Sequence, residues 1–241
     1  MIAIIGVQED DILYFKAKMA PLQTIPLIGD HVCYRGKLGD EEVVLLATGR
    51  GDYFSAMLTG VLIKEYGPYI VYSIGSVASL SPTFRQGDLF IPERIHFADV
   101  DFSELPRMVF GQVEADRKPY FVQDSVLNNQ GEATAYRLAS RYVQRGYLFS
   151  GEKDFLKETP LLAISEKYFK EEEAMSCFDS TSAGVSLACD AAKVPCFHLK
   201  VISYEVGNEE QKLNYYRKGL EAMPEIGRII TGMMVGSDLE D

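Results

Sequence analysis

The sequence predicts an α/β fold of three layers, in which a central mixed, mostly parallel twisted sheet is flanked by helices. Short runs of consecutive apolar residues, such as Ile2-Ala3-Ile4-Ile5, are typical of strands that are buried on both faces. These runs alternate with helical segments, which favours parallel strands joined by crossover helices. The chain has 241 residues, 47% of them hydrophobic, and no repeat or linker divides it, so we expect one domain over residues 1–241.

Apolar runs and turn residues mark the N-terminal elements. Residues 2–5 predict the first strand, and the acidic residues 9–11 behind it suit the N-terminus of a helix, where carboxylates meet unpaired backbone N–H groups. Residues 32–36 and 43–48 predict two further strands around a turn at residues 37–40.

Glycines mark the predicted ends of helices and strands in the next part of the chain. Gly49-Arg50-Gly51 opens a helix, which Gly67-Pro68 ends because a proline disfavours helical backbone before it. Residues 69–74 form an apolar run that predicts a strand stopping at Gly75-Ser76. Residues 89–91 predict the strand after it.

The segment of residues 99–129 is polar and irregular, and it is longer than an ordinary connection between two elements. We therefore expect a loop that could cover a ligand. Beyond this loop the alternation of helices and strands resumes. The predicted elements are a helix near residues 133–144, a strand near 147–150, a helix near 183–192, a strand at 196–203 and a terminal helix from Glu209 that Pro224 interrupts.

Charge and cysteine content narrow the class of partner. A formal net charge of -11 makes nucleic acid and anionic membrane surfaces poor partners, because clustered Lys and Arg hold such ligands. The four cysteines have no metal-ligand spacing with the three histidines, which favours reduced thiols. There is no basic N-terminal region and no long apolar segment. We expect a soluble cytoplasmic protein that takes a small neutral or cationic ligand and uses no metal or cofactor.

Several polar groups fall at predicted strand ends, where α/β sheets bind ligands. Asp11 and Glu205 are carboxylates at the ends of two different strands. This arrangement suits a pair in which one acid protonates a leaving group and the other activates water. The alternative is that Asp11 caps a helix and Glu205 is a surface charge. Gly75-Ser76 is either a ligand-binding turn or a turn with a solvated serine. Gly49-Arg50-Gly51 is either an anion-binding nest or a helix-entry turn with Arg50 in water.

Taken in order along the whole chain, these motifs resemble those of the methylthioadenosine/S-adenosylhomocysteine nucleosidases, members of the nucleoside phosphorylase superfamily. The matching segments are Ile4-Ile5-Gly6, Gly49-x-Gly51, Ile74-Gly75-Ser76, Leu80-x-Pro82-Thr83-x5-Gly87-Asp88, His96-x-Ala98-Asp99-Val100, Phe110-Gly111-Gln112, Ser150-Gly151, Val194-Pro195 and Ile202-Ser203. The resemblance implies a nucleoside phosphorylase-like fold that hydrolyses the N-glycosidic bond of a purine nucleoside.

The resemblance also implies roles for three groups. An aspartate after the Ile-Ser pair protonates the base, a glutamate near the N-terminus activates water, and a Glu-Met-Glu motif holds the ribose hydroxyls. These roles are chemically coherent because the sugar becomes cationic as the bond breaks while the departing base gains electron density.

This chain departs from the family pattern at each of these positions. Asp11 replaces the glutamate and reaches about 1 Å less far. Asp179-Ser180-Thr181 replaces Glu-Met-Glu, so a neutral threonine hydroxyl stands in for a carboxylate and binds the sugar less strongly. After Ile202-Ser203, the acid position holds Tyr204 in strict register, or Glu205 if one residue is inserted, and we prefer Glu205.

Other expected contacts follow from the same resemblance. Phe155 and Leu156, after one inserted residue, fall where the family holds the purine, although Phe155 suits the core equally well. The remaining expected substrate contacts are Ser76, Val77, Asp179, Ser180, Thr181, Ser203 and Tyr204.

The preferred hypothesis is therefore a purine nucleoside hydrolase in which Glu205 is the acid and Asp11 activates water. Only Arg50 could bind phosphate near the Gly-Ser pair, which favours hydrolysis over phosphorolysis. Two alternatives stay open: a nucleoside-binding protein of this fold that has lost the chemistry, and a purine nucleoside phosphorylase that uses Arg50. By resemblance we also expect a homodimer.

Overall fold

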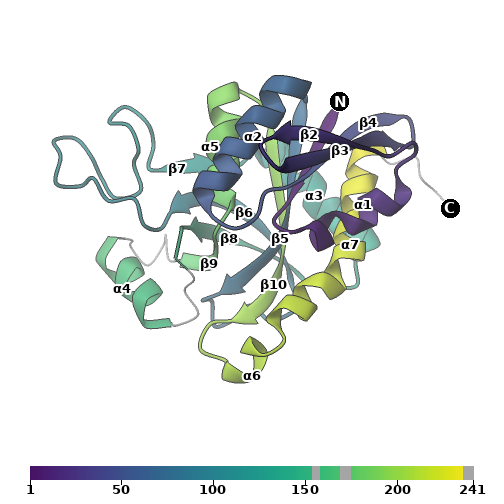
Figure 1. The fold of residues 1–241 in the computed structure, drawn as a ribbon. Coiled ribbons are helices and arrows are strands. Elements are labelled where there is room, and N and C mark those ends of the chain that lie inside the picture. Colours follow the sequence, from purple (N-terminus) through teal and green to yellow (C-terminus); the bar gives the residue numbers. More distant parts are fainter. Residues whose placement is uncertain (154–157, 169–174, 236–241) are drawn as a thin grey trace.

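The computed structural model describes residues 1–153, 158–168 and 175–235 (Figure 1). The strands are β1 (Ile2–Gly6), β2 (Gln23–Ile28), β3 (His31–Leu38), β4 (Glu41–Ala47), β5 (Ile70–Ser79), β6 (Leu89–Phe97), β7 (Tyr120–Val122), β8 (Val143–Ser150), β9 (Met175–Asp179) and β10 (Cys196–Glu205). The helices are the 3₁₀ helix η1 (Glu9–Ile12), α1 (Leu13–Lys18), α2 (Asp52–Tyr66), α3 (Ser125–Leu138), α4 (Glu158–Tyr168), α5 (Ser182–Ala192), α6 (Glu209–Lys212) and α7 (Tyr215–Val235).

The described strands form one mixed sheet in the order β10-β6-β8-β9-β5-β1-β4-β3-β2, with β7 paired to β6. Strand β10 also pairs in parallel with β5, so the strands β10, β6, β8, β9 and β5 close into a ring. The predicted mixed α/β fold is confirmed, although antiparallel ladders are as frequent as parallel ones. One reason is that short turns join β2, β3 and β4, and such turns allow only antiparallel pairing.

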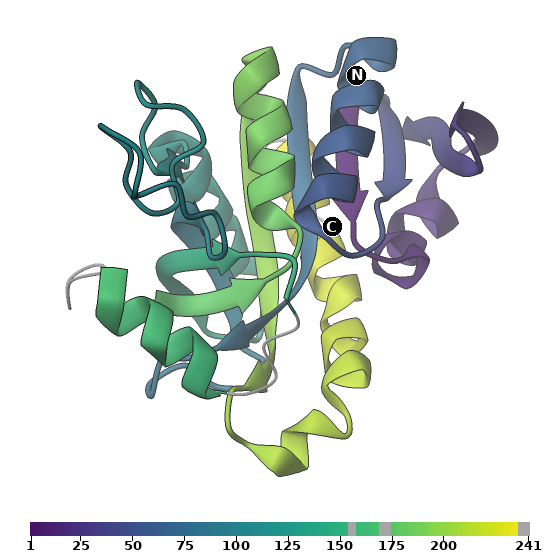
Figure 2. The same cartoon turned by 60° about the vertical axis from the view of Figure 1, so that its left-hand side comes forward.

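Helices cover the sheet on two sides, as Figures 1 and 2 show: α2 and α5 stand side by side on one face, and α1, α3 and α7 lie on the other. The alternation of side chains along β1 explains both layers. Ile2 and Ile4 belong to the same buried cluster as Ile226 of α7. Ala3 and Ile5 point the other way and pack in a cluster with residues of α2 and α5.

Several predicted elements are longer in the structure than in the sequence analysis. The helix after Gly51 and the strands near residues 43–48 and 196–203 are present as α2, β4 and β10. Strand β5, however, does not stop at Gly75-Ser76 but continues to Ser79, because β10 pairs with it beyond that point. Gly75 tolerates its φ of 146°, a value that other residues rarely adopt.

The structure also contains elements that the sequence did not predict. The irregular segment after residue 99 ends with β7, and α3 begins already at Ser125. The elements β2, α4 and β9 were not predicted either. Strand β2 contains Pro26, which is typical of an edge strand, and β2 lies at the edge of the sheet.

The prediction that Pro224 interrupts the terminal helix is wrong. Helix α7 runs through Pro224, and the break lies instead between α6 and α7, at residues 213–214. The apolar face of α7 is buried on both sides of the proline, with Ala222 and Ile226 fully inaccessible. Tertiary packing of this face outweighs the one backbone hydrogen bond that proline removes.

Candidate active site

A cavity of about 300 Å³ opens near the carboxyl ends of β1, β5, β9 and β10. The first half of α7 closes one side of it, because Gly219 lets the helix approach Ser76 so closely that an added Cβ would lie 3.2 Å from the Cβ of that serine. The lining residues are Val7, Gln8, Asp11, Arg50, Gly51, Ser76, Val77, Ala78, Glu152, Lys153, Phe178, Asp179, Ser180, Thr181, Ser203, Tyr204, Tyr215, Tyr216, Gly219 and Leu220.

Asp11 is a nearly buried carboxylate in the wall of this cavity, with 7% of its surface exposed. Its Oδ2 accepts hydrogen bonds from the backbone N–H groups of Val7, at 3.0 Å, and Gln8, at 2.9 Å. Burial raises the pKa of Asp11, while these two hydrogen bonds and the charge of Lys200 oppose the rise. A carboxylate of this kind is a better proton acceptor than one in water.

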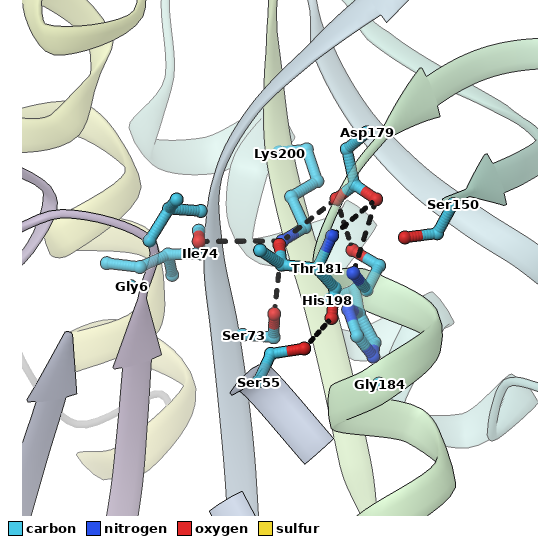
Figure 3. A network of polar contacts seen from close by, with 12 residues as sticks. Gly6, Ser55, Ser73, Ile74, Ser150, Asp179, Thr181, Gly184, His198 and Lys200 are labelled. Carbon is cyan, nitrogen blue, oxygen red and sulfur yellow. Dashed lines mark hydrogen bonds and ion pairs between the residues drawn. The ribbon is translucent and has the colours of Figure 1, made fainter. Parts of the chain in front are cut away.

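Lys200 lies behind the cavity wall, in the middle of β10, and only 1% of it is exposed. Figure 3 shows its side chain extending toward Asp179 and Ile74. The Nζ atom lies 3.7 Å from Oδ2 of Asp179, 3.0 Å from Oγ of Ser73 and 3.5 Å from the carbonyl oxygen of Ile74. Burial lowers the pKa of Lys200, and the carboxylates of Asp179 and Asp11 oppose this change. The ammonium group therefore stabilises both carboxylates.

The segment Asp179-Ser180-Thr181 joins the end of β9 to the start of α5 and forms another part of the cavity wall. The carboxylate of Asp179 accepts hydrogen bonds from the backbone N–H groups of Thr181 and Ser182 and from Oγ of Ser182, at 2.5 Å. The carbonyl of Ser180 accepts from the N–H of Gly51, which ties this wall to the start of α2.

Asp52 is a second buried carboxyl group beside Asp179. Its Oδ1 accepts from Oγ of Ser150, at 2.9 Å, and from the N–H of Gly184, at 2.7 Å. Its Oδ2 has no hydrogen-bond partner among the described residues. Burial and the nearby charge of Asp179 raise the pKa of Asp52 to about 7.

The ends of β5 and β10 carry the remaining sequence-predicted contacts. Parallel pairing aligns Ser76 with Val201 and Val77 with Ile202, and a bulge then leaves Ser203 as an extra residue before Tyr204. Ser76, Val77, Ser203 and Tyr204 all line the cavity. The phenol oxygen of Tyr204 accepts a hydrogen bond from the N–H of Gly207, at 3.2 Å.

Glu205 differs from the expectation, because it is absent from the described wall of the cavity. Its carboxylate accepts hydrogen bonds from the backbone N–H of Gln86 and from Nε2 of Gln211, both at 3.0 Å. Successive side chains of a strand point to opposite faces, so the bulge that turns Tyr204 toward the cavity turns Glu205 away from it. In this geometry Glu205 holds the loop before β6 against α6.

Arg50 lies at the rim of the cavity, where its Nη2 donates to the phenol oxygen of Tyr215, at 3.1 Å. The start of α2 next to it already holds an anion, because the N–H of Tyr53 donates to Oε1 of Glu152, at 2.8 Å. Gly51, with a φ of 102°, makes room for this carboxylate. The protein's own glutamate thus binds a helix N-terminus that would suit a phosphate.

Two expected purine contacts, Phe155 and Leu156, lie outside the described residues. Sequence reasoning missed Lys200 and Asp52, as well as Tyr216 at the rim. Lys200 had a visible signal, since it is the single charged residue in the apolar run Phe197-His198-Leu199-Lys200-Val201-Ile202. Among the described residues, no cluster of three His, Cys, Asp or Glu side chains is arranged to hold a metal ion.

Comparisons with known proteins agree on one family. A family model described as the phosphorylase superfamily matches residues 1–230. The chain is 26% identical over 208 residues to the 5′-methylthioadenosine/S-adenosylhomocysteine nucleosidase of Bacillus thuringiensis subsp. konkukian, and this match covers 86% of the chain and 87% of that protein. The nucleosidase of Bacillus anthracis matches with the same identity and coverage.

Solved structures share the fold over almost the whole chain. The nucleosidase of Campylobacter jejuni superposes with a TM-score of 0.87 at 22% identity, covering 97% of each chain. The nucleosidase of Neisseria meningitidis, in complex with methylthio-immucillin-A, gives 0.86 at 20% identity, covering 96% of this chain and 98% of that one.

Proposed function

The chain belongs to the phosphorylase superfamily, and we propose that it is a nucleosidase, which hydrolyses the N-glycosidic bond of a purine nucleoside of the methylthioadenosine/S-adenosylhomocysteine type. The products are the free base and a ribose derivative. The observation that carries this proposal is the buried carboxylate of Asp11, with its raised pKa, in the same cavity wall as Ser76 and Thr181. The curated relatives from Bacillus are named for this activity.

Asp11 activates the water molecule. As the bond between the sugar and the base breaks, the anomeric carbon becomes cationic and water attacks it. Asp11 accepts one proton of this water, so that the sugar gains a hydroxyl group. Asp11 and Asp179 also stabilise the cationic sugar by their negative charge, and the charge of Lys200, which lies 3.7 Å from Asp179, opposes the rise in the pKa of Asp11.

The base leaves with the electron pair of the broken bond and takes up a proton from solvent, which Asp11 returns when it gives up the proton of the attacking water. Tyr204 contacts the departing base, and this assignment takes the place of Glu205. Its support is that Tyr204 lines the cavity, whereas Gln86 and Gln211 hold the carboxylate of Glu205. Ser76, Thr181 and Ser203 offer hydroxyl groups to the sugar and the base from the same wall.

Water is preferred to phosphate as the attacking group. Glu152 occupies the N-terminus of α2, and Asp11 and Asp179 add negative charge to the cavity. A phosphate dianion that attacks the sugar beside Asp11 and Asp179 would be repelled by these two carboxylates, whereas a neutral water molecule would not.

The nucleosidase acts as a homodimer in the cytoplasm. Support for a dimer is the exposed apolar face of α2, where Tyr53, Phe54 and Met57 are 76%, 52% and 45% exposed. Support for the cytoplasm is that all four cysteines are free thiols. Within the described residues, no helix is both long and apolar enough to cross a membrane. Sedimentation velocity tests the dimer, and cell fractionation tests the location.

Release of free base tests the function directly. Methylthioadenosine, S-adenosylhomocysteine, adenosine and inosine are incubated with the protein, with and without phosphate, and the products are separated by chromatography. Base release without phosphate supports hydrolysis. Release only with phosphate identifies a phosphorylase, and tight binding without release identifies a nucleoside-binding protein.

A further inference from the structure

The cavity has two chemically different ends. One end is built by Phe178 of β9 together with Ser203 and Tyr204 of β10. The other end is built by Gln8, after β1, by Arg50, before α2, and by the first turn of α7. In the sheet, β5 lies between β9 and β1, so Ser76 of β5 separates the two ends.

The proposed function orients a nucleoside between these ends. If Tyr204 contacts the base and Asp11 activates the water at the anomeric carbon, the base occupies the end at β9 and β10. The 5′ position of the ribose, which lies on the far side of the sugar from the base, then points toward Gln8 and Arg50.

This second end is lined by polar groups with hydrogen bonds to offer. The guanidinium of Arg50 donates to the hydroxyl of Tyr215, and the hydroxyl of Tyr216 donates to Oδ2 of Asp10, at 2.7 Å. A guanidinium carries five N–H donors in a planar fork, so Arg50 can donate to several acceptors at once, Tyr215 among them. Gln8 lines the same end of the cavity.

We propose that this end recognises an anionic group on the 5′ position of the nucleoside, a carboxylate or a phosphate, and that Arg50 is the specificity-determining residue. The proposal rests on the proposed function, which sets the direction of the ligand. An anion accepts charge-assisted hydrogen bonds from Arg50 and from the neighbouring tyrosine hydroxyl. A methylthio group would remove water from these polar groups without replacing its hydrogen bonds.

The acidic composition of the chain does not oppose this assignment. The net charge of -11 describes the whole surface, whereas recognition depends on the groups within a few ångströms of the ligand. The carboxylates near this end already accept hydrogen bonds, Asp10 from Tyr216 and Glu152 from the N–H of Tyr53. Arg50 and Lys153 are the two cations in the described lining of the cavity, and the hydrogen bond to Tyr215 holds Arg50 beside the first turn of α7.

The test compares four nucleosides that share adenine and ribose and differ only at the 5′ position: adenosine, methylthioadenosine, S-adenosylhomocysteine and adenosine 5′-monophosphate. kcat/KM for adenine release is measured for the native protein, for Arg50→Met and for the control Arg217→Met. Arg217 lies on α7, next to the cavity-lining Tyr216, but its side chain is 70% exposed and reaches only Glu221 among the described residues.

For the native protein, a substrate that carries an anionic group on the 5′ position is expected to give the highest kcat/KM. S-adenosylhomocysteine, which carries a carboxylate together with an ammonium group, marks a carboxylate site, and the monophosphate marks a phosphate site. Arg50→Met should lower this value by about tenfold more than it lowers the value for adenosine. Arg217→Met should leave the ratio between these two values unchanged. A preference of the native protein for methylthioadenosine, or an equal loss on all four substrates in Arg50→Met, overturns the proposal.

A second measurement distinguishes a failure of the proposed function from a failure of this inference. If none of the four compounds releases adenine, their affinities are measured by calorimetry for the same three proteins. A preference for an anionic compound that is lost in Arg50→Met still supports the inference. Equal affinities in the native protein and in Arg50→Met overturn it.

Discussion

The missing side chain of Gly6 allows Asp11 to take its place in the site. Gly6 ends β1, and a Cβ added to it would lie 2.9 Å from both the Cβ of Asp11 and a methyl group of Ile12. The absence of a side chain at this position lets η1 fold back against the strand. The carboxylate of Asp11 then meets the N–H groups of Val7 and Gln8.

Replacing Asp11 by asparagine should lower kcat for base release by about 10²- to 10⁴-fold, because an amide cannot accept the proton of the attacking water. Product chromatography under single-turnover conditions measures the effect. Glu9→Gln is the matched control, since Glu9 lies in the same short helix but pairs with Lys16 at the surface. Full activity of Asp11→Asn would remove this residue from the mechanism.

Two conservative substitutions distinguish the role of Tyr204 from that of Glu205. Tyr204→Phe should reduce kcat by about tenfold or more, because it removes the hydroxyl of a cavity-lining residue that we propose contacts the base. Glu205→Gln should retain most of the activity, since the amide oxygen can still accept from the N–H of Gln86. The rates of base release from both variants decide between the two residues. Loss of activity in Glu205→Gln with full activity in Tyr204→Phe would restore Glu205 as the acid.

At the scale of elements, the contact between α2 and α5 positions the carboxyl groups behind the cavity. Gly184, in the first turn of α5, lies against the carbonyl of Asp52 and the hydroxyl of Ser55, and an added Cβ would overlap both atoms. The close approach allows the N–H of Gly184 to donate to Asp52. The two helices therefore have to meet at a glycine.

Gly184→Ala should destabilise the protein by about 1–3 kcal/mol, because the helices must move apart to admit the methyl group. Gly60→Ala, within α2, meets no atom within 4 Å and should stabilise by about 0.5–1 kcal/mol through helix propensity. Urea unfolding of both variants measures the difference. If the two changes have equal effects, the approach of α5 to α2 is not tight.

At the scale of the whole molecule, charged groups from distant parts of the sequence form one buried row. Asp52 begins α2, Asp179 ends β9, Lys200 lies in β10 and Asp11 follows β1. Three acids and one base cannot all be ionised there at low cost, because burial penalises every uncompensated charge. The raised pKa of Asp52 indicates that this residue keeps its proton most readily.

Asp52 should therefore make the stability of the protein depend on pH. Its pKa is about 7 in the folded protein, compared with 3.8 in the unfolded chain. Between these values the folded state binds a proton that the unfolded state has lost, so the stability falls as the pH rises from about 4 to about 7 and stays low above. This contribution is at most roughly 4 kcal/mol.

Asp52→Asn mimics the protonated carboxyl and should remove most of this decline. Denaturant unfolding between pH 4 and pH 8 measures it in the native protein and in the variant. Asp116→Asn, at an exposed position, is the control and should follow the native curve. A native pH profile in Asp52→Asn would mean that other groups carry the dependence.

Most of the candidate site could be located from the sequence, because its residues follow apolar strands. Asp11, Ser76 and Ser203 were expected at strand ends and Thr181 was expected from the family resemblance, and the structure brings all four to the wall of one cavity. Lys200 could not be assigned a role in the same way. Its partner Asp179 lies on another strand, and only the folded chain brings the two together.

The sequence by itself determined the fold class, the strands β1, β4, β5 and β10 and the start of α2, since apolar runs and glycines act on their immediate neighbours. The tertiary structure decided which of Tyr204 and Glu205 faces the cavity, because a bulge in β10 sets the alternation of side chains there. It also decided the protonation of the buried carboxyl groups. That property depends on burial and on charges from remote segments, neither of which local sequence contains.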